Sequence, residues 1–239
     1  MKVDIHPLEN ETILHLSSGC ISTFINPYQL LSTFINFVGQ PCHSLQIRKQ
    51  TVGQQRLDFL RESFRNLRST GSVAPSSRFL CRAIAEKIDP LRAKVVVELG
   101  PGDGVITHFI LKRLQPDAQL LIFEINEAFV KKLHIAFQHD KRVVIIYDSA
   151  ENMGRYFDEM GIKQVDYFIS GIPFIMLPEV LAERITSACL HWLAVGGRFV
   201  QFHYFPLMLH FYKRIFGNMD VDVVPLNIPP ALIVCCEKR

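Results

Sequence analysis

The chain has 239 residues, 49% of them hydrophobic and 21% charged, with a formal net charge of +3, which fits one ordinary domain with an extension. Its six cysteines form no Cys-x-x-Cys pair, so we expect reduced core thiols of a cytoplasmic protein. Its nine histidines form no His-Glu-x-x-His cluster, and we predict no metal site.

We expect no secretory signal in the N-terminal stretch, because no basic patch precedes a compact apolar core with a cleavage site. From Thr12 to Ile47 there is no Asp, Glu, Lys or Arg, and apolar residues recur at helical spacing. Asn26-Pro27 interrupts this run and is typical of a helix start. The segment is too polar and broken to span a membrane, so we expect an interfacial or core-covering helix.

Basic residues are concentrated between Arg48 and Arg68, where six bases face two acids. Leucines and one phenylalanine fall on one helical face of this segment, which predicts a basic amphipathic helix. Such a helix can lie on an anionic membrane, gaining about 1 kcal/mol per basic residue near the surface. Packing on the main domain is the equal alternative. Nucleic acid is less favoured as a partner, because the charge is not spread around a pocket.

A strand followed by a glycine turn is predicted at Val95 to Gly104, where the sequence is VVVELGPGDG. The glycines allow the backbone to approach a ligand, and the next helix directs its N–H groups towards it. Glu124 ends the next apolar run, where an acid would accept both hydroxyls of a ribose. The pattern indicates a site for an adenosine-containing cofactor, with a purely structural turn as the alternative.

The details of this loop select the cofactor. A dinucleotide fingerprint needs a sixth-position glycine where this chain has Val105, and no phosphate-binding Gly-Lys-Ser or Gly-Lys-Thr follows. The spacing Glu-x-Gly-x-Gly-x-Gly suits a ligand with a ribose and an amino-acid tail but no phosphates. We therefore predict S-adenosylmethionine as the cofactor. Its predicted contacts from this half of the site are Glu98, Gly100, Gly102, Glu124 and Ile125.

The remaining elements alternate between strand and helix. We expect helices at 104–114, Asn126–Gln138 and Pro178–Leu193, strands at Gln119–Glu124, Arg142–Tyr147, Val165–Ser170 and Arg198–Tyr204, and two final strands within Val221–Cys236. This order predicts an α/β fold with a doubly wound, mostly parallel, seven-stranded Rossmann-like sheet in residues 71–239. Residues 1–70 are predicted to be a helical, membrane-associating extension.

Ligands bind such sheets at the carboxyl ends of the strands. There we predict that Asp148 accepts the adenine amino group, with Ser149 and Ala150 against the ring; a helix N-cap role is compatible with this. The Ser170-Gly171-Ile172-Pro173-Phe174 turn leaves the next strand beside the expected methyl sulfonium. Gly171 allows close approach, and the carbonyl groups of the turn can face an amine. Phe174 either contacts a substrate or packs in the core.

Several segments together resemble the bacterial phospholipid N-methyltransferases. They are Phe59–Arg61, Gly71–Arg78, Val97–Gly102, Ser170–Pro173, Gly196–Phe202 and Asn227–Ala231. The resemblance runs from about Asp58 to the C-terminus and implies a class I S-adenosylmethionine-dependent enzyme. It also implies docking on the inner face of the cell membrane as a peripheral protein. The implied substrate is the amine of phosphatidylethanolamine or a related aminolipid, methylated stepwise towards phosphatidylcholine.

Phe174 departs from that family, in which the corresponding position is more often aliphatic. It brings the turn closer to the Asn-x-Pro-Phe/Tyr of rRNA adenine N6-dimethyltransferases, although Ser170 replaces their asparagine or aspartate. An enzyme of that kind is therefore the alternative, as is a non-catalytic relative that binds cofactor and lipid.

Amine methylation requires mainly that a neutral nitrogen be aligned with an activated methyl group. The expected catalytic residues are Ser170 and Gly171, whose carbonyls hold the amine N–H groups, and Tyr204, whose ring faces the growing cation. Phe174 is expected to share that contact. No His or carboxylate stands out as the base. Arg68 and Arg78 are the candidates for binding the lipid phosphate.

Overall fold

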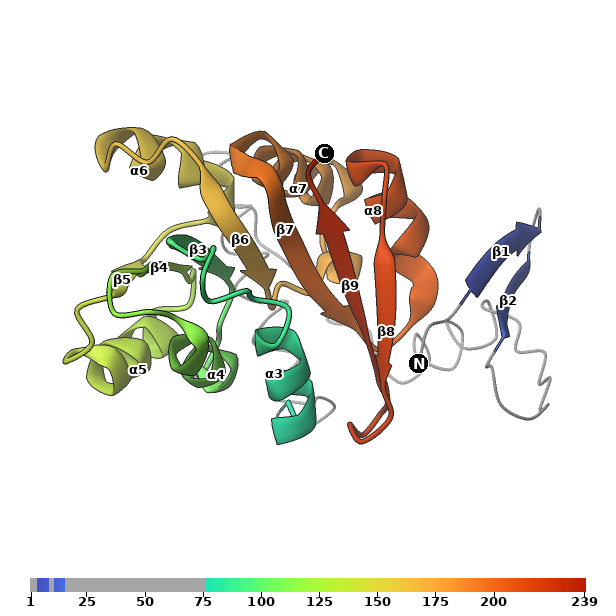
Figure 1. The fold of residues 1–239 in the computed structure, drawn as a ribbon, viewed down its shortest axis with the longest axis horizontal. Helices are drawn as coiled ribbons and strands as arrows, with labels where there is room; N and C mark the ends of the chain where they lie inside the picture. Colours follow the sequence, from blue (N-terminus) through green and yellow to red (C-terminus); the bar gives the residue numbers. More distant parts are fainter. Residues whose placement is uncertain (1–3, 9–10, 16–75) are drawn as a thin grey trace, which may run out of the picture. The chain divides into compact units, whose positions relative to one another are not determined.

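The computed structural model describes residues 4–8, 11–15 and 76–239 (Figure 1). The chain divides into two compact units, Met1–Val52 and Gly53–Arg239. In the first, β1 (Asp4–Leu8) pairs antiparallel with β2 (Glu11–His15). The prediction of a helical extension is therefore wrong for these residues, which form strands. The predicted helices within 16–47 and 48–68, and the predicted boundary at residue 70, lie outside the described residues.

The second unit is built on a seven-stranded sheet in the order β5-β4-β3-β6-β7-β9-β8. Its parallel strands are β3 (Val95–Leu99), β4 (Gln119–Phe123), β5 (Val143–Ile146), β6 (Val165–Ser170) and β7 (Leu193–His203). Two antiparallel strands, β8 (Asp220–Val224) and β9 (Ala231–Glu237), complete it. The predicted doubly wound, mostly parallel sheet is confirmed. The strand order reverses between β3 and β6, which is where such sheets bind ligands.

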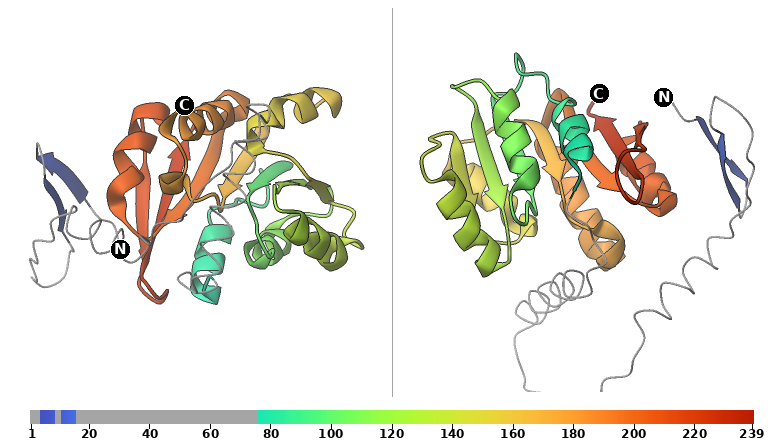
Figure 2. Two further views of the ribbon diagram at one scale, coloured as in Figure 1. Left: turned by 180° about the vertical axis from the view of Figure 1, so that it is seen from behind. Right: turned by 90° about the horizontal axis from the view of Figure 1, so that it is seen from below.

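Helices cover both faces of this sheet (Figure 2). The core on one face includes residues of α3 (Arg78–Ala85), α4 (Val105–Arg113) and α5 (Glu127–Phe137). The other helices are α6 (Met153–Glu159), α7 (Glu179–Trp192) and α8 (Leu209–Phe216), with 3-10 turns η1 (Ala150–Asn152), η2 (Phe174–Met176) and η3 (Pro206–Met208). None of the described helices is long and apolar enough to cross a bilayer.

The strand β7 begins five residues earlier than the predicted start at Arg198. Leu193 pairs with Val165, whereas Arg198 pairs with Tyr167, so the register between β6 and β7 shifts by an irregularity. Gly196 accommodates this irregularity with a φ of 75°. Beyond it the two strands run in regular register to Ser170, which places the end of β6 beside β7.

Candidate functional site

The loop between β3 and α4 depends on left-handed glycines. Gly100 has a φ of 64°, and a side chain there would lie 3.0 Å from Cγ1 of Ile172. Gly104, with a φ of 80°, is the N-cap residue of α4, and its added Cβ would lie 2.9 Å from Leu133 and Phe137. A side chain at either position would strain the left-handed backbone and crowd these neighbours, so the bare backbone of the loop lies at the carboxyl end of β3.

Glu124 reaches back from the end of β4 to this loop. The side chain is buried, its Oε2 accepts a hydrogen bond from the Gly102 N–H at 3.1 Å, and its Oε1 accepts one from the Asn126 N–H at 2.8 Å. The carboxylate is therefore held against the glycine loop, at the position where this acid is predicted to accept the ribose hydroxyls. The predicted partners of an adenosine-containing cofactor are thus brought together, and the donor set fits one.

Glu98 lies beneath the loop, with only 1% of its surface exposed. The Thr107 hydroxyl on α4 donates a hydrogen bond to its Oε2 at 2.7 Å. Burial raises the pKa of Glu98 to about 8; the Thr107 hydrogen bond opposes this rise and the nearby Glu124 adds to it. Glu98 therefore links the end of β3 to α4, and its ionisation has an energetic cost that a nearby cationic ligand would reduce.

This pKa predicts a pH dependence of stability that Glu98→Gln removes. The folded pKa lies above the ordinary 4.5, so the native state holds this proton more tightly and the resulting stability is lost as pH rises towards 8. Each pKa unit corresponds to about 1.4 kcal/mol. We expect the wild type to lose a few kcal/mol relative to the variant between pH 5 and 8, measured by urea unfolding. Exposed Glu127→Gln is the control, and parallel curves for wild type and Glu98→Gln would contradict this assignment.

The turn after β6 packs backbone against backbone on the glycine loop. The Gly171 N–H donates to the Leu99 carbonyl at 2.8 Å, and an added Cβ on Gly171 would lie 2.6 Å from the Gly100 carbonyl oxygen. The buried Ser170 hydroxyl accepts from the Ile172 N–H at 3.2 Å. The structure therefore places the predicted catalytic turn directly beside the predicted cofactor loop.

Gln201 supports this turn and was not among the predicted site residues. It lies on β7 opposite Ser170 and is only 2% exposed. Its Nε2 donates to the carbonyls of Ile172 at 3.1 Å and of Phe202 at 3.0 Å. The sequence signal is one amide side chain within the otherwise apolar run Phe199–Phe202, and such a buried polar group needs partners.

Asn227 is a second residue of this region that was not among the predicted site residues. The side chain is buried, and its Oδ1 accepts from the Ser77 N–H at 3.0 Å while its Nδ2 donates to the Pro229 carbonyl at 2.6 Å. Tyr204 follows β7 and packs its ring on Phe202. Burial raises the pKa of Tyr204, and a hydrogen bond with Asn227 opposes this rise. The end of β7, the β8–β9 loop and the start of α3 are thereby joined.

The prediction that Phe174 contacts a substrate is wrong. Its side chain is only 1% exposed, and its ring packs against Phe199 and Tyr212, with centroids 6.4 Å and 6.3 Å away. The short helix η2 turns this ring into the core, while the next two side chains, Ile175 and Met176, face outward. The core-packing alternative is the correct one.

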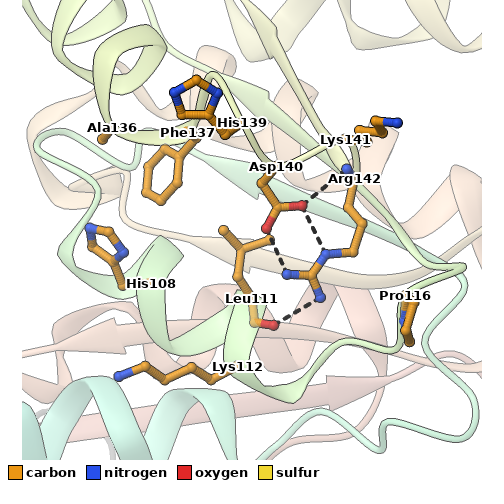
Figure 3. A pocket seen from close by; sticks show the side chains of 10 residues that line it. All are labelled: His108, Leu111, Lys112, Pro116, Ala136, Phe137, His139, Asp140, Lys141 and Arg142. Atoms are coloured by element: carbon orange, nitrogen blue, oxygen red, sulfur yellow. Dashed lines mark hydrogen bonds and ion pairs between the residues drawn. The ribbon is translucent and has the colours of Figure 1, made fainter.

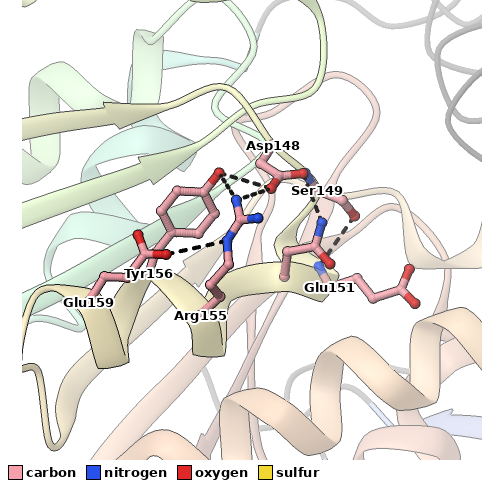
Figure 4. Close-up of polar contacts among 7 residues, drawn as sticks. Asp148, Ser149, Glu151, Arg155, Tyr156 and Glu159 are labelled. Atoms are coloured by element: carbon pink, nitrogen blue, oxygen red, sulfur yellow. Dashed lines mark hydrogen bonds and ion pairs between the residues drawn. The ribbon is translucent and has the colours of Figure 1, made fainter. Parts of the chain in front are cut away.

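Asp148 organises the turn after β5 (Figure 4). Its Oδ1 accepts hydrogen bonds from the Ser149 N–H at 2.7 Å and from Asn152 Nδ2 at 2.9 Å. Its Oδ2 accepts from the Tyr156 hydroxyl at 2.9 Å and from Arg155 Nη2 at 3.3 Å. These four donors match the acceptor capacity of a carboxylate. An adenine amino group would therefore have to displace one, and the exposed Arg155 makes the longest of these bonds.

The other predicted cofactor contacts lie on neighbouring loops. Ile125 is half-buried directly after Glu124, and Ala150 is buried at the start of η1. Ser149 caps η1 by accepting from the Glu151 N–H at 3.3 Å. All three lie at the carboxyl edge of β4 and β5, the same edge as the glycine loop.

Of the two arginines predicted to bind a lipid phosphate, one lies within the described residues. Arg78 is exposed at the first position of α3, and its guanidinium lies 5.0 Å above the Phe79 ring. Arg68 lies outside the described residues. Only Arg78 can therefore be placed at the carboxyl edge of the sheet.

A separate groove of about 770 Å³ lies at the opposite edge (Figure 3). It is lined by His108, Leu111, Lys112, Pro116 and residues 136–142. There Arg142 pairs with Asp140 at 2.6 Å and donates to the carbonyls at the end of α4, Leu111 and Leu114. Arg142 precedes β5, so this groove is remote from the predicted site. In residues 76–239 no group of three or more His, Cys, Asp or Glu is arranged to hold a metal.

Comparisons with known proteins consistently give methyltransferases. The model of the ribosomal RNA adenine dimethylase family matches residues 69–216. Ornithine lipid N-methyltransferase of Singulisphaera acidiphila is 31% identical over 180 residues, which cover 75% of this chain and 94% of that protein. Ribosomal RNA small subunit methyltransferase A of Acidobacterium capsulatum is 28% identical over 110 residues, covering 46% and 37%.

Solved structures agree on the fold. A protein from Streptococcus mutans that was solved with SAH (S-adenosylhomocysteine) and is assigned as a methyltransferase has a TM-score of 0.52 at 17% identity; the match covers 69% of this chain and 99% of that one. Precorrin-6y C5,15-methyltransferase of Geobacter metallireducens has a TM-score of 0.54 at 14% identity, covering 67% and 88%. These likenesses confirm the Rossmann-like methyltransferase fold.

Proposed function

Because the chain belongs to the ribosomal RNA adenine dimethylase family and is an S-adenosylmethionine-dependent N-methyltransferase, we propose that its acceptor is the amine of an aminolipid. Phosphatidylethanolamine is the proposed lipid, and an ornithine lipid offers the same chemistry. The observation that carries the proposal is the extent of the likeness. It spans almost the whole lipid methyltransferase but only 37% of the rRNA enzyme. Attachment to the inner membrane face belongs to the same proposal.

The cofactor, when bound, supplies an electrophilic methyl group on a sulfonium. Glu124 would accept the ribose hydroxyls while it holds the Gly102 N–H, so one side chain would orient both the ribose and the loop. The Ser170 and Gly171 carbonyls receive the N–H groups of the acceptor amine. Ser170 and Gln201 fix the shape of this turn through their hydrogen bonds to Ile172. Catalysis is thus mainly alignment of a nitrogen lone pair with the methyl group.

Two further steps concern the proton and the product charge. No carboxylate or imidazole in the described turn acts as the base in this proposal, so water or the lipid phosphate takes the ammonium proton. With Phe174 in the core, the ring of Tyr204 alone remains from the predicted aromatic contacts for a methylated ammonium. Arg78 is exposed at the same edge for the lipid phosphate.

Methylation of rRNA adenine is the second candidate, favoured by the family match over residues 69–216. The resemblance to those enzymes implies an asparagine or aspartate at the start of the turn. This chain has Ser170 there, and the Ser170 hydroxyl is bonded to the Ile172 N–H.

The experiment supplies purified protein with labelled S-adenosylmethionine and three acceptors: phosphatidylethanolamine vesicles, ornithine lipid vesicles and 16S rRNA. We expect label in a lipid and none in rRNA, and mass spectrometry of the product gives the number of methyl groups. Label only in rRNA would overturn the lipid proposal. Binding of SAH without transfer to any acceptor would indicate a non-catalytic relative.

A further inference from the structure

Exposed apolar side chains gather on three loops at the carboxyl ends of β6 and β7 and between β8 and β9. Of thirteen large hydrophobic residues exposed in 76–239, six lie on these loops. We call these six the apolar rim: Ile175, Met176, Phe205, Leu207, Leu226 and Ile228. Their exposed fractions range from 38% at Phe205 to 85% at Ile228. Exposed apolar patches of this kind mark interaction sites.

The three loops form one continuous edge around the proposed acceptor turn. The short helices η2 and η3 contact each other. His203 at the end of β7 pairs with Leu232 near the start of β9, so the β8–β9 loop ends beside Tyr204. In Figure 1 that loop lies at the lower edge of the sheet, next to α3. The hydrogen bond from Ser77 to Asn227 joins it to the first turn of α3, which carries Arg78.

The composition of the rim loops is unusual. The segments 171–178, 204–208 and 225–230 contain no Asp, Glu, Lys or Arg, although 21% of the chain is charged. They contain six prolines, at 173, 178, 206, 225, 229 and 230. Proline has no N–H donor, so these loops present fewer backbone donors that would lose hydrogen bonds to water in an apolar medium.

We propose that the apolar rim inserts into the headgroup and acyl boundary of a lipid bilayer. This rests on the proposed aminolipid acceptor, whose amine would then reach the Ser170–Pro173 turn while its chains stay in the bilayer. Uncharged, proline-rich loops suit a bilayer better than a polar protein surface, and the exposed Arg78 beside them suits anionic headgroups. The other occupants, residues 1–75 of this chain or a second copy, are outcomes of the test.

Insertion is tested directly with a tryptophan at Leu226, because the chain has one native tryptophan, Trp192. We expect Leu226→Trp fluorescence to be quenched by vesicles of brominated lipid that also contain an anionic lipid. Leu91→Trp is the matched control: Leu91 is 80% exposed but precedes β3, at the opposite edge. Wild type gives the Trp192 background. Quenching of neither variant, or of both equally, would overturn the proposal.

A double variant, Leu207→Asp with Leu226→Asp, measures how much the apolar rim contributes to vesicle binding. We expect about tenfold weaker vesicle binding or more, since two large apolar side chains lose their burial. The deficit should persist in high salt, because screening weakens charge contacts but not apolar ones. Leu91→Asp with Val195→Asp controls for charge added at exposed apolar positions elsewhere. Equal vesicle binding by the two doubles would overturn the proposal.

A short-chain, water-dispersed aminolipid distinguishes a failure of the proposed function from a failure of the insertion proposal. If both proposals hold, the rim double methylates this acceptor like wild type and binds SAH equally, and fails only on vesicles. If wild type methylates neither form of lipid, the proposed function fails, while tryptophan quenching still decides insertion. If the folded double variant changes its oligomeric state yet keeps its vesicle binding, protein covers the apolar rim and insertion is overturned.

Discussion

Replacing Gly171 with alanine is expected to abolish methyl transfer and to weaken SAH binding by at least about tenfold. The added Cβ would lie 2.6 Å from the Gly100 carbonyl oxygen, a separation that real Cβ atoms do not show. Since both atoms are held by backbone, relief requires the turn after β6 to move away from the glycine loop. One movement therefore disturbs the cofactor loop and the acceptor turn together. Calorimetric titration with SAH and a methylation assay measure the two losses.

The matched control for this variant is Gly154→Ala in α6. Its added Cβ would have Nε1 of Trp192 as the nearest atom, 3.5 Å away, which is ordinary contact. Alanine also favours a helix by about 1 kcal/mol over glycine, so stability should hold or rise with activity unchanged. If Gly171→Ala keeps full SAH affinity and turnover while folding normally, the close packing of turn on loop is not what forms the site.

The central strands were predictable because their signal is local. β3, β4 and β6 are mostly apolar and mostly buried, and β6 has the predicted bounds, Val165 and Ser170. Alternation with helices then restricts the topology, since parallel crossovers are right-handed. The glycine loop and Glu124 were predicted from the same kind of local spacing. In the structure a hydrogen bond joins them.

The helices α3, α6 and α8 were not predicted because each has only seven or eight residues, too few for a clear helical period. Phe174 was assigned to the substrate for a related reason. Its burial is decided by Tyr212 on α8, which reaches the turn from a distant part of the chain. A pattern within the turn cannot show a ring that packs there from elsewhere.

Long-range hydrogen bonds explain the site residues that sequence reasoning missed. Asn227 accepts from Ser77, 150 positions earlier, and Gln201 donates to Ile172, 29 positions earlier. For neither side chain do the adjacent residues in the sequence indicate the hydrogen-bond partner. Their role appears only when the sheet sets the carboxyl ends of β6, β7 and the β8–β9 loop side by side.

Glu124→Gln is expected to weaken SAH binding by about 100-fold and to lower the free energy of unfolding by roughly 1–3 kcal/mol, because a buried backbone donor loses its acceptor. The carboxylate holds the N–H groups of Gly102 and Asn126 and, in the proposed complex, two ribose hydroxyls. An amide keeps one acceptor oxygen and turns donor atoms towards those same donors. Hydrogen bonds to a charged group are worth roughly 1.5–3 kcal/mol each, so losing one or two gives an effect of this size. Titration calorimetry measures it.

A double-mutant cycle decides whether the loss comes from the ribose itself. SAH and an analogue without ribose hydroxyls are each titrated into wild type and Glu124→Gln. If Glu124 contacts the hydroxyls, removing them costs affinity in the wild type but little in the variant, because the lost interaction is the same one. Exposed Glu127→Gln, three residues along, should behave as wild type with both ligands. Additive losses would instead mean that Glu124 acts only by holding the Gly102 loop, and the ribose contact would have to be assigned to another residue.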